Sequence, residues 1–453
     1  MVAQLAAAGL SGTVVNVSVT VAVVAIAGEF DASIAAAAAT VVLLNVSMAF
    51  TMPLAGAWSA RLGARRLLAG AGLIVLGSSI LLSLAPNLVV LAIARAAQGA
   101  GLAAVVPVSV QASGQLLVGD QRARALGWWG ASNGLGLAFA PVIGGAIVDL
   151  VGWRWVTVPS CLLGIALMVT ALRAIPADLP HGSAVRFRGL GLVALVTGTG
   201  MSALAAASAE GWLVAGALAV VCVVAGVVAG RATRPNRELA DLRRWARDHS
   251  VRRSSLGATM QMVANGLVQV GVPAWLIVNG LLGAGQAAAI LMGMTLTMAA
   301  MGPITGRRST VSYPSRLRRG LVGCAAGLLG LTVAAVAGPW WLASPSLVVL
   351  GLGAGSLLSP SLTAFSQTEA GASTVALSLF NLARLGSFGI GGLLGGASVD
   401  AEVPGAAFLV VAVVCGIAAA RVCSIDERDR TGSIDARDGR SAPDGAGGGT
   451  DHG

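Results

Sequence analysis

The chain of 453 residues contains no lysine and has few charged side chains of any kind. Asp, Glu, Lys and Arg make up 11% of the residues, whereas 56% are hydrophobic. A water-soluble protein of this length needs a larger charged surface, so the composition excludes a set of two or three soluble domains. The absence of lysine, together with many Ala, Gly and Val residues, indicates a GC-rich coding sequence and hence a bacterial source.

Residues for enzymatic or metal chemistry are also scarce. The spacing of the cysteines fits neither a disulfide framework nor a zinc site; they are Cys161, Cys222, Cys324, Cys415 and Cys423. The histidines all lie in predicted loops or in the tail; they are His181, His249 and His452. We find no nucleophile–base pair, metal-binding cluster or phosphate-binding loop, so we expect no enzyme activity, no metal and no cofactor.

The basic charge is confined to alternate loops between long apolar segments. These loops contain Arg61, Arg65, Arg66, Arg122, Arg124, Arg173, Arg186 and Arg188, then the arginines in 231–253, in 307–319 and after Arg421. The loops between them carry acids and one arginine, namely Glu29, Asp31, Asp149, Arg154, Glu210, Asp400 and Glu402. Because cytoplasmic loops retain arginine, the alternation predicts a multi-pass protein of the plasma membrane with both termini in the cytoplasm. Topology and anionic lipid then explain the net charge of +10, and we expect no nucleic-acid partner.

Fourteen apolar segments are long enough to cross the hydrocarbon core as helices, which needs about 20 residues each. They lie at residues 4–27, 34–55, 67–85, 88–112, 127–149, 155–175, 189–208, 211–230, 255–278, 284–305, 318–337, 343–365, 373–397 and 404–422. The chain opens directly into the first segment without a positively charged region, so we expect a retained span rather than a cleaved signal peptide. The sequence therefore predicts an all-α integral membrane protein.

Two regions are not predicted to be spans. Residues 231–254 are rich in arginine and carry Leu239, Leu242 and Trp245 at helical spacing. That pattern predicts a cytoplasmic linker with a short interfacial helix. Residues 423–453 consist mainly of Asp, Arg, Gly and Ser, which predicts a disordered cytoplasmic tail.

An internal repeat relates the first and second halves of the chain. Pro-Leu-Ala-Gly at 53–56 and Pro-Ile-Thr-Gly at 303–306 each lead into an arginine cluster, and Met-Ala precedes both at the same offset. The repeat predicts two pseudo-symmetric six-helix halves, 1–175 and 255–422, with two inserted helices at 189–230 between them. Such an arrangement predicts a central site that is reached alternately from either side of the membrane.

Several short motifs identify a family. Residues 56–66 read Gly-Ala-Trp-Ser-Ala-Arg-Leu-Gly-Ala-Arg-Arg, and residues 95–101 read Arg-Ala-Ala-Gln-Gly-Ala-Gly. Residues 133–145 end in Ala-Pro-Val-Ile-Gly-Gly and are followed by Trp-Arg-Trp, and residues 381–386 read Asn-Leu-Ala-Arg-Leu-Gly. Together they resemble the major facilitator superfamily, and in particular its fourteen-span drug:proton antiporter branch. The resemblance implies two halves that rock about a central cavity and export amphipathic organic compounds.

Polar residues inside the spans are the candidates for lining this cavity. A charge within the bilayer is costly unless it faces protein or water, so we expect Arg95 and Arg384 to point inward. The predicted lining consists of Asn16, Arg95, Gln98, Asn133, Gln261, Asn265, Asn381 and Arg384. Two alternatives stay open: Arg95 could extend to the outer headgroups, and Arg384 and the stripe of Gln261, Asn265 and Gln269 could serve as contacts between helices.

Two further motifs have predicted structural roles. The arginine-bearing turn anchors the topology, and the resemblance implies that it also latches the inward gate; its residues are Gly56, Arg61, Gly63, Arg65 and Arg66. The family's acidic position in this turn is Ala60 here. The glycine-rich fifth span predicts close helix packing and a bend, through Gly136, Pro141, Gly144 and Gly145.

Proton coupling is left open because no Asp, Glu or His lies near the middle of any predicted span. The first span has Ser11 at the position where the branch has an acid. Arginine cannot release a proton at accessible pH, so an acid at the rim, such as Asp149 or Asp31, would have to couple transport to protons. We expect a monomer that contacts membrane lipid and a neutral or anionic small-molecule substrate. The alternatives are an uncoupled facilitator or importer of the same fold and a degenerate paralogue that no longer transports.

Overall fold

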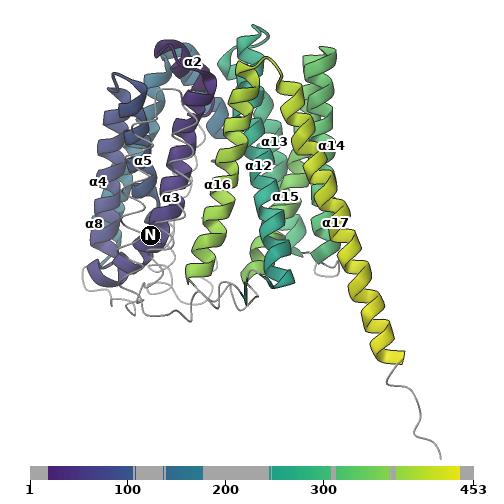
Figure 1. Ribbon diagram of the computed structural model, residues 1–453. Coiled ribbons are helices and arrows are strands. Elements are labelled where there is room, and N and C mark those ends of the chain that lie inside the picture. Colours follow the sequence, from purple (N-terminus) through teal and green to yellow (C-terminus); the bar gives the residue numbers. More distant parts are fainter. Residues whose placement is uncertain are drawn as a thin grey trace, which may run out of the picture.

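The computed structural model is a bundle of helices that run between two opposite faces (Figure 1). The structure describes residues 19–105, 139–176, 247–307, 313–366 and 374–438, and the single positions 108, 136, 244, 245 and 368. One face holds the helix ends with Glu29, Asp149 and Asp400, and we call it the acid-bearing face. The other holds the helix ends with Arg66 and Arg252, and we call it the arginine-rich face.

The first half of the bundle contains short and long helices that pack through small residues. Its elements are α2 (Val23–Glu29), α3 (Ile34–Leu62), α4 (Ala64–Ser83), α5 (Leu88–Leu102), the helix Phe139–Val151, the 3-10 helix η1 (Trp153–Thr157) and α8 (Val158–Ala174). Helix α4 packs against α8 and α5, and α3 packs against α5. A Cβ atom on Gly72 would lie 2.7 Å from the carbonyl oxygen of Gly164, so α4 and α8 need glycine to approach this closely.

The helices of the second half also pack through small residues. Its elements are α12 (His249–Val278), α13 (Ala284–Arg307), α14 (Tyr313–Ala337), the 3-10 helix η2 (Trp340–Leu342), α15 (Ala343–Ser366), α16 (Thr374–Asp400) and α17 (Pro404–Asp438). Helix α12 packs against α16, and α14 packs against α15 and α17. A Cβ atom on Gly266 would lie 2.0 Å from the Phe388 carbonyl oxygen, so the backbones of α12 and α16 are in direct contact.

The lengths and surfaces of the helices fit a membrane environment. Seven helices in the described part of the chain are long and apolar enough to cross a bilayer, namely Ala64–Ser83, Trp153–Arg173, His249–Val278, Ala284–Met301, Tyr313–Ala337, Trp340–Leu357 and Pro404–Val422. Large apolar side chains such as Leu84 and Val336 are 72% and 75% exposed, which suits contact with lipid rather than water. The inserted spans predicted at 189–208 and 211–230 lie outside the described residues, so the count of fourteen stays a prediction.

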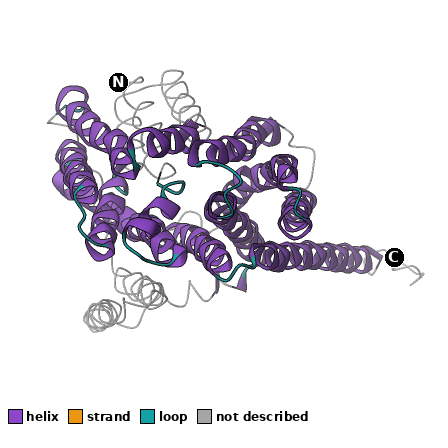
Figure 2. Ribbon diagram, turned by 90° about the horizontal axis from the view of Figure 1, so that it is seen from above, coloured by secondary structure: helices purple, strands orange, loops and turns teal. Residues whose placement is uncertain are grey.

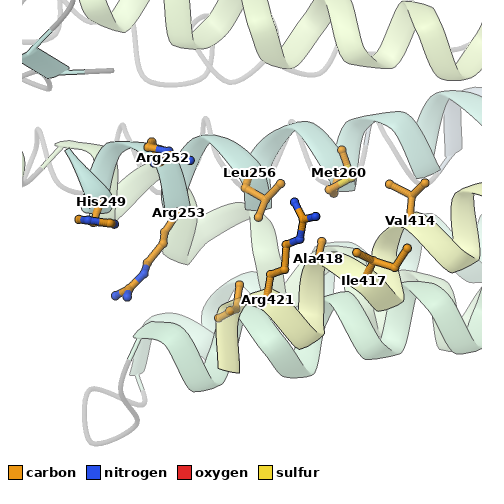
Figure 3. Close-up of a pocket in the computed structure, with 10 residues that line it drawn as sticks. His249, Arg252, Arg253, Leu256, Met260, Val414, Ile417, Ala418 and Arg421 are labelled. Carbon is orange, nitrogen blue, oxygen red and sulfur yellow. The ribbon is translucent and has the colours of Figure 1, made fainter. Parts of the chain in front are cut away.

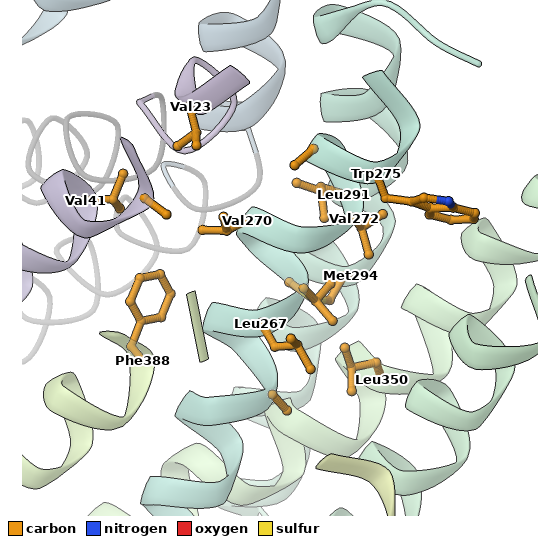
Figure 4. Close-up of a cluster of buried hydrophobic side chains, with 14 of the residues drawn as sticks. Val23, Val41, Leu267, Val270, Val272, Trp275, Leu291, Met294, Leu350 and Phe388 are labelled. Atoms are coloured by element: carbon orange, nitrogen blue, oxygen red, sulfur yellow. The ribbon is translucent and has the colours of Figure 1, made fainter. Parts of the chain in front are cut away.

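The two halves meet through α3 and α16, which lie side by side (Figure 1), and Figure 2 shows the helix bundle from above. A Cβ atom on Gly389 would lie 2.4 Å from Cγ1 of Val42, so this contact also depends on glycine. Figure 4 shows the hydrophobic cluster that continues across the junction, from Val41 of α3 past Phe388 of α16 to Leu267 of α12. The halves therefore share one buried core in this region.

Two boundaries near the arginine-rich face differ from the predicted ones. Residues 56–62 form the last turns of α3 rather than a loop, and α4 begins at Ala64. The turn between them is Gly63, whose φ of 82° is a conformation that favours glycine. Helix α12 begins at His249 instead of 255, because the Asp248 side chain accepts a hydrogen bond of 2.8 Å from the Ser250 amide and caps the helix there.

The tail also differs from its prediction. The sequence predicts disorder from residue 423 onwards, but α17 continues as a helix to Asp438. Extending an existing helix adds one hydrogen bond per residue without the cost of a new nucleus. The sequence supports this extension with oppositely charged residues at a spacing of four, such as Asp426 and Arg430. Residues 439–453 lie outside the described residues.

Candidate functional site

A buried polar stripe runs along α12. Gln261, Asn265 and Gln269 repeat every fourth residue and are 0%, 6% and 2% exposed. The Gln269 side chain donates a hydrogen bond of 2.8 Å to Oδ1 of Asn265, and Nε2 of Gln261 lies 3.8 Å from the Met298 sulfur. The Oε1 atoms of Gln261 and Gln269 are buried and have no hydrogen-bond partner among the described residues. Buried polar atoms are normally paired, so these two amides have acceptor capacity to spare.

Helix α16 carries the next pair of candidates. Asn381 and Arg384 lie in this helix, which packs against α12 on one side and α3 on the other, and both side chains are half-buried. The Nε atom of Arg384 is buried without a hydrogen-bond partner within the described ranges. Its guanidinium group places a half-buried positive charge on the helix that contacts both halves, and such a charge would stabilise a nearby anion.

Arg95 is the charged lining candidate that lies in the first half. Its side chain is 0% exposed, and its Nη1 donates a hydrogen bond of 2.7 Å to Oε1 of Gln98. Nε2 of Gln98 then donates a hydrogen bond of 2.9 Å to Oγ of Ser79 on α4. The Nε and Nη2 atoms of Arg95 have no partner in the described part of the chain. Arg95 thus faces protein, as the cost of exposing a charge to lipid predicts, but its recorded contacts point toward α4.

The structure brings some predicted residues together and keeps others apart. The stripe on α12 and the pair on α16 lie on adjacent helices, whereas Arg95 and Gln98 form a separate group with Ser79. Among the described residues no hydrogen bond connects the two groups. Asn16 and Asn133, the remaining predicted lining residues, lie outside the described residues.

The predicted gating turn is compact. Gly56 and Arg61 belong to α3, Gly63 forms the turn, and Arg65 and Arg66 lie in the first turn of α4. Arg65 is half-buried and Arg66 is exposed at the arginine-rich face. The first turn of a helix has positive dipole charge, so two arginines there are not stabilised by their own helix. No ion pair of either side chain occurs among the described residues, so they add positive charge to this face.

The glycine-rich motif packs the first half against the second. Pro141, Gly144 and Gly145 lie in the helix Phe139–Val151 and are buried, as is the single described position Gly136. A Cβ atom on Gly145 would lie 2.7 Å from the carbonyl oxygen of Ala284, the first residue of α13. The motif accordingly brings the fifth predicted span against the start of α13, in the other half.

Two aspartates near these contacts were not predicted to bind across the halves. The Asp149 carboxylate accepts hydrogen bonds from the amides of Ala284 and Gly285, at 3.2 and 2.7 Å. The Asp400 carboxylate accepts hydrogen bonds from the amides of Ile34 and Ala35, both at 2.9 Å. Each carboxylate caps a helix of the opposite half, where the helix dipole favours negative charge. No local sequence signal marks these two contacts, and the aspartates lie one residue out of register with the internal repeat, which relates Pro53 to Pro303.

A third acid holds the first half together at the acid-bearing face. Glu29 forms an ion pair with Arg154 and accepts a hydrogen bond from the Trp153 indole, and Nη2 of Arg154 donates to the Ala85 carbonyl at 3.1 Å. The Arg154 guanidinium lies 4.6 Å from the Trp153 ring centroid. Hydrogen bonding from Arg154 lowers the pKa of the Glu29 carboxyl below its usual 4.5. This cluster ties α2, α4 and the start of α8 to one another.

No group of three metal-ligating side chains occurs among the described residues. The profile of the Major Facilitator Superfamily matches residues 5–388. The chain belongs to the major facilitator superfamily. Members of this superfamily are multi-pass membrane transporters rather than enzymes, and the seven long apolar helices in the described part of the chain fit that class.

The chain is also similar to bacterial multidrug transporters. It is 29% identical over 244 residues to the Multidrug resistance protein B homolog of Mycobacterium tuberculosis, which covers 52% of this chain and 45% of that protein. It is 28% identical over 366 residues to the Multidrug transporter protein MdtP of Bacillus subtilis, which covers 75% of this chain and 64% of that protein. The matches span less than two thirds of the length of these relatives.

The fold is also similar to that of a solved transporter structure with low sequence identity. A crystal structure of a peptide transporter in complex with sulfate has a TM-score of 0.69 at 15% identity, over 94% of both chains. Identity at this level indicates a common fold and carries no information about the substrate.

Proposed function

We propose that this facilitator exports amphipathic organic compounds by alternating access, as a member of the fourteen-span drug:proton antiporter branch. The observation that carries the proposal is the reciprocal junction of the halves, in which Asp149 and Asp400 each cap a helix of the other half at the acid-bearing face. Bonds of this kind close one end of a pathway and can break without unfolding either half. The multidrug transporters among the relatives support export of organic compounds.

The proposed pathway is lined by Asn16, Arg95, Gln98, Asn133, Gln261, Asn265, Asn381 and Arg384. Its charged members are both arginines, and no carboxylate contacts either of them among the described residues. An unpaired positive charge repels a cation and attracts an anion, most strongly where water is excluded. We therefore propose neutral or anionic substrates.

Dye export from everted membrane vesicles tests the substrate class. Export of an anionic dye should be saturable and should exceed export of a cationic dye of similar size. R384Q should lower anion export about tenfold, which corresponds to losing about 1.4 kcal/mol of charge interaction. R319Q is a matched control, because it removes an arginine from the exposed surface of α14. Saturable export of the cation alone would contradict the proposal.

The energy source is tested separately. We propose that acids at the acid-bearing face, rather than inside the spans, couple export to protons. In proteoliposomes, accumulation of the dye driven by an imposed pH gradient supports antiport. Transport that is indifferent to the gradient supports the alternative of an uncoupled facilitator or importer, and normal insertion with no flux of any compound supports a non-transporting paralogue.

The orientation belongs to the same proposal. We place the arginine-rich face and both termini in the cytoplasm and treat the transporter as a plasma-membrane monomer. Arg66 and Glu402 are exposed at opposite faces, so they are suitable positions for introduced cysteines. A membrane-impermeant thiol reagent added to intact cells should label a cysteine at 402 and leave one at 66 unlabelled.

A further inference from the structure

A pocket at the arginine-rich face is lined by residues of α12 and α17 (Figure 3). It has a volume of about 360 Å³. Residues from the first turns of α12 form one wall, and residues near the end of the apolar part of α17 form the other. The size lies within the range of small-molecule sites, which is about 300–1,000 Å³.

Among the described residues that line this pocket, the charged groups are all basic. His249, Arg252 and Arg253 contribute from α12, and Arg421 contributes from α17. No Asp or Glu occurs in that described part of the lining. The acid next in sequence, Asp248, uses its side chain to cap α12 through the Ser250 amide. The pocket thus combines three guanidinium groups from two helices, an arrangement that favours an anion with several oxygen atoms.

The rest of the pocket is apolar and opens toward the bilayer. Met260 and Leu256 are half-buried on the α12 side, whereas Val414 and Ile417 of α17 are 44% and 51% exposed. Exposed valine and isoleucine on a membrane-spanning helix face lipid chains rather than water. The apolar wall begins next to the arginines and continues toward the middle of the span, because Val414 lies two turns inward from Arg421.

The height of the arginines in the membrane matches that of lipid headgroups. Arg421 lies one residue before the end of the apolar span Pro404–Val422, and Arg252 lies in the first turn of α12. Arginine side chains at span ends normally reach the interface, where phosphate groups are concentrated. A ligand in this pocket therefore has its charged part at headgroup level and its apolar part beside Val414 and Ile417.

We propose that this pocket binds an anionic phospholipid of the leaflet at the arginine-rich face. The phosphate accepts hydrogen bonds from Arg252 and Arg421, and an acyl chain lies along Val414 and Ile417. A free phosphate ion offers the same anionic chemistry but leaves the apolar wall unused. The inference is independent of the proposed transport direction, because the pocket lies outside the proposed pathway.

Native mass spectrometry of the detergent-purified full chain, with phosphatidylglycerol added, tests the proposal. R252Q and R421Q should each weaken phosphatidylglycerol binding about fivefold, the effect expected for one arginine at a membrane surface. R319Q is the matched control, because it removes an exposed arginine from α14 at the same face without lining the pocket. It should bind the lipid as the unmodified chain does.

Two results would overturn the proposal. The first is equal binding of phosphatidylglycerol by all four proteins, with each variant eluting as a folded species in size-exclusion chromatography. The second is full displacement of the lipid by inorganic phosphate at equal concentration, which would assign the pocket to a free anion. Stronger binding of phosphatidylglycerol than of zwitterionic phosphatidylcholine, lost in R252Q and R421Q alone, supports it.

Discussion

Asp400 at the end of α16 caps the helix that begins at Ile34, and Asp149 caps the pseudo-equivalent helix that begins at Ala284. Each half thus supplies the cap of a helix in the other half. The separation of Ile34 from Ala284 along the chain equals that of Pro53 from Pro303, so the exchange follows the internal repeat. The junction at the acid-bearing face is therefore held by two equivalent carboxylate contacts.

Removing one of these carboxylates should open the junction. We expect D400A to destabilise the closed arrangement by about 1 kcal/mol, the usual effect of losing a helix cap, and to raise the open population about fivefold. D149A should act similarly, and the double variant should show the sum of both effects. Spin labels at Leu84 and Val336, exposed on opposite halves at this face, report the opening as a longer distance.

The comparison with asparagine separates capping from charge. D400N keeps one oxygen that can accept an amide hydrogen bond, so it should open the junction less than D400A. An unchanged distance distribution in D400A and D149A would contradict a closing role for these aspartates.

Glycine at the contact between α12 and α16 should be indispensable. A Cβ atom on Gly391 would lie 2.1 Å from the Val263 carbonyl oxygen, whereas one on Gly386 of the same helix meets no atom within 4 Å. We expect G391A to lower the free energy of unfolding by about 1–3 kcal/mol, because the two backbones must separate. G386A should be neutral or slightly stabilising, since alanine favours helix. Thermal unfolding of both variants in detergent checks this, and equal melting temperatures would contradict the packing described.

Much of the fold follows from sequence patterns that act locally. Arginine placement and apolar length predict which segments are membrane helices, and the structure has a helix at each predicted span that it describes in full. Seven helices in the described part of the chain are long and apolar enough to cross a bilayer. Their ends were less predictable. The arginines at 61, 65 and 66 were interpreted as a loop, yet α3 continues to Leu62 because a helix need not stop where the hydrocarbon core ends. Only the turn at Gly63 breaks it.

The candidate site was predictable in composition but only partly in arrangement. The buried stripe on α12 follows from a spacing of four residues, which local helix geometry fixes. The contact of Gln98 with Ser79 depends on how α5 packs against α4, and the capping of Ile34 by Asp400 joins residues 366 positions apart. No sequence pattern around these residues predicts either contact.

The ion pair at the acid-bearing face should make stability depend on pH. Arg154 lowers the pKa of Glu29, so the ionised carboxyl contributes stability at neutral pH that is lost as the pH falls through this lowered value. Both side chains are more than a third exposed, so the contribution is small, about 0.5 kcal/mol. E29Q should therefore melt slightly below the unmodified chain at pH 7, and the difference should vanish in acid.

The control for this prediction is E402Q. Glu402 is exposed at the same face, and no hydrogen bond or ion pair of its side chain occurs among the described residues. A difference between E29Q and the unmodified chain that persists in acid, or that E402Q reproduces, would contradict the role of the Arg154 contact.

We expect Arg95 to lower the stability of the folded protein while contributing to export of the anion. Its guanidinium group is fully buried, and its one recorded partner is the neutral amide of Gln98. Burying a charge without a carboxylate partner costs more than the single hydrogen bond returns, which is about 1 kcal/mol. R95M keeps a similar length without the charge, so its melting temperature should equal or exceed that of the unmodified chain. Its export of the anionic dye should fall at least about tenfold, because the pathway loses one of its two charges. A variant that melts clearly lower, with export reduced only in proportion to the folded protein, would instead make Arg95 a structural contact between α5 and α4.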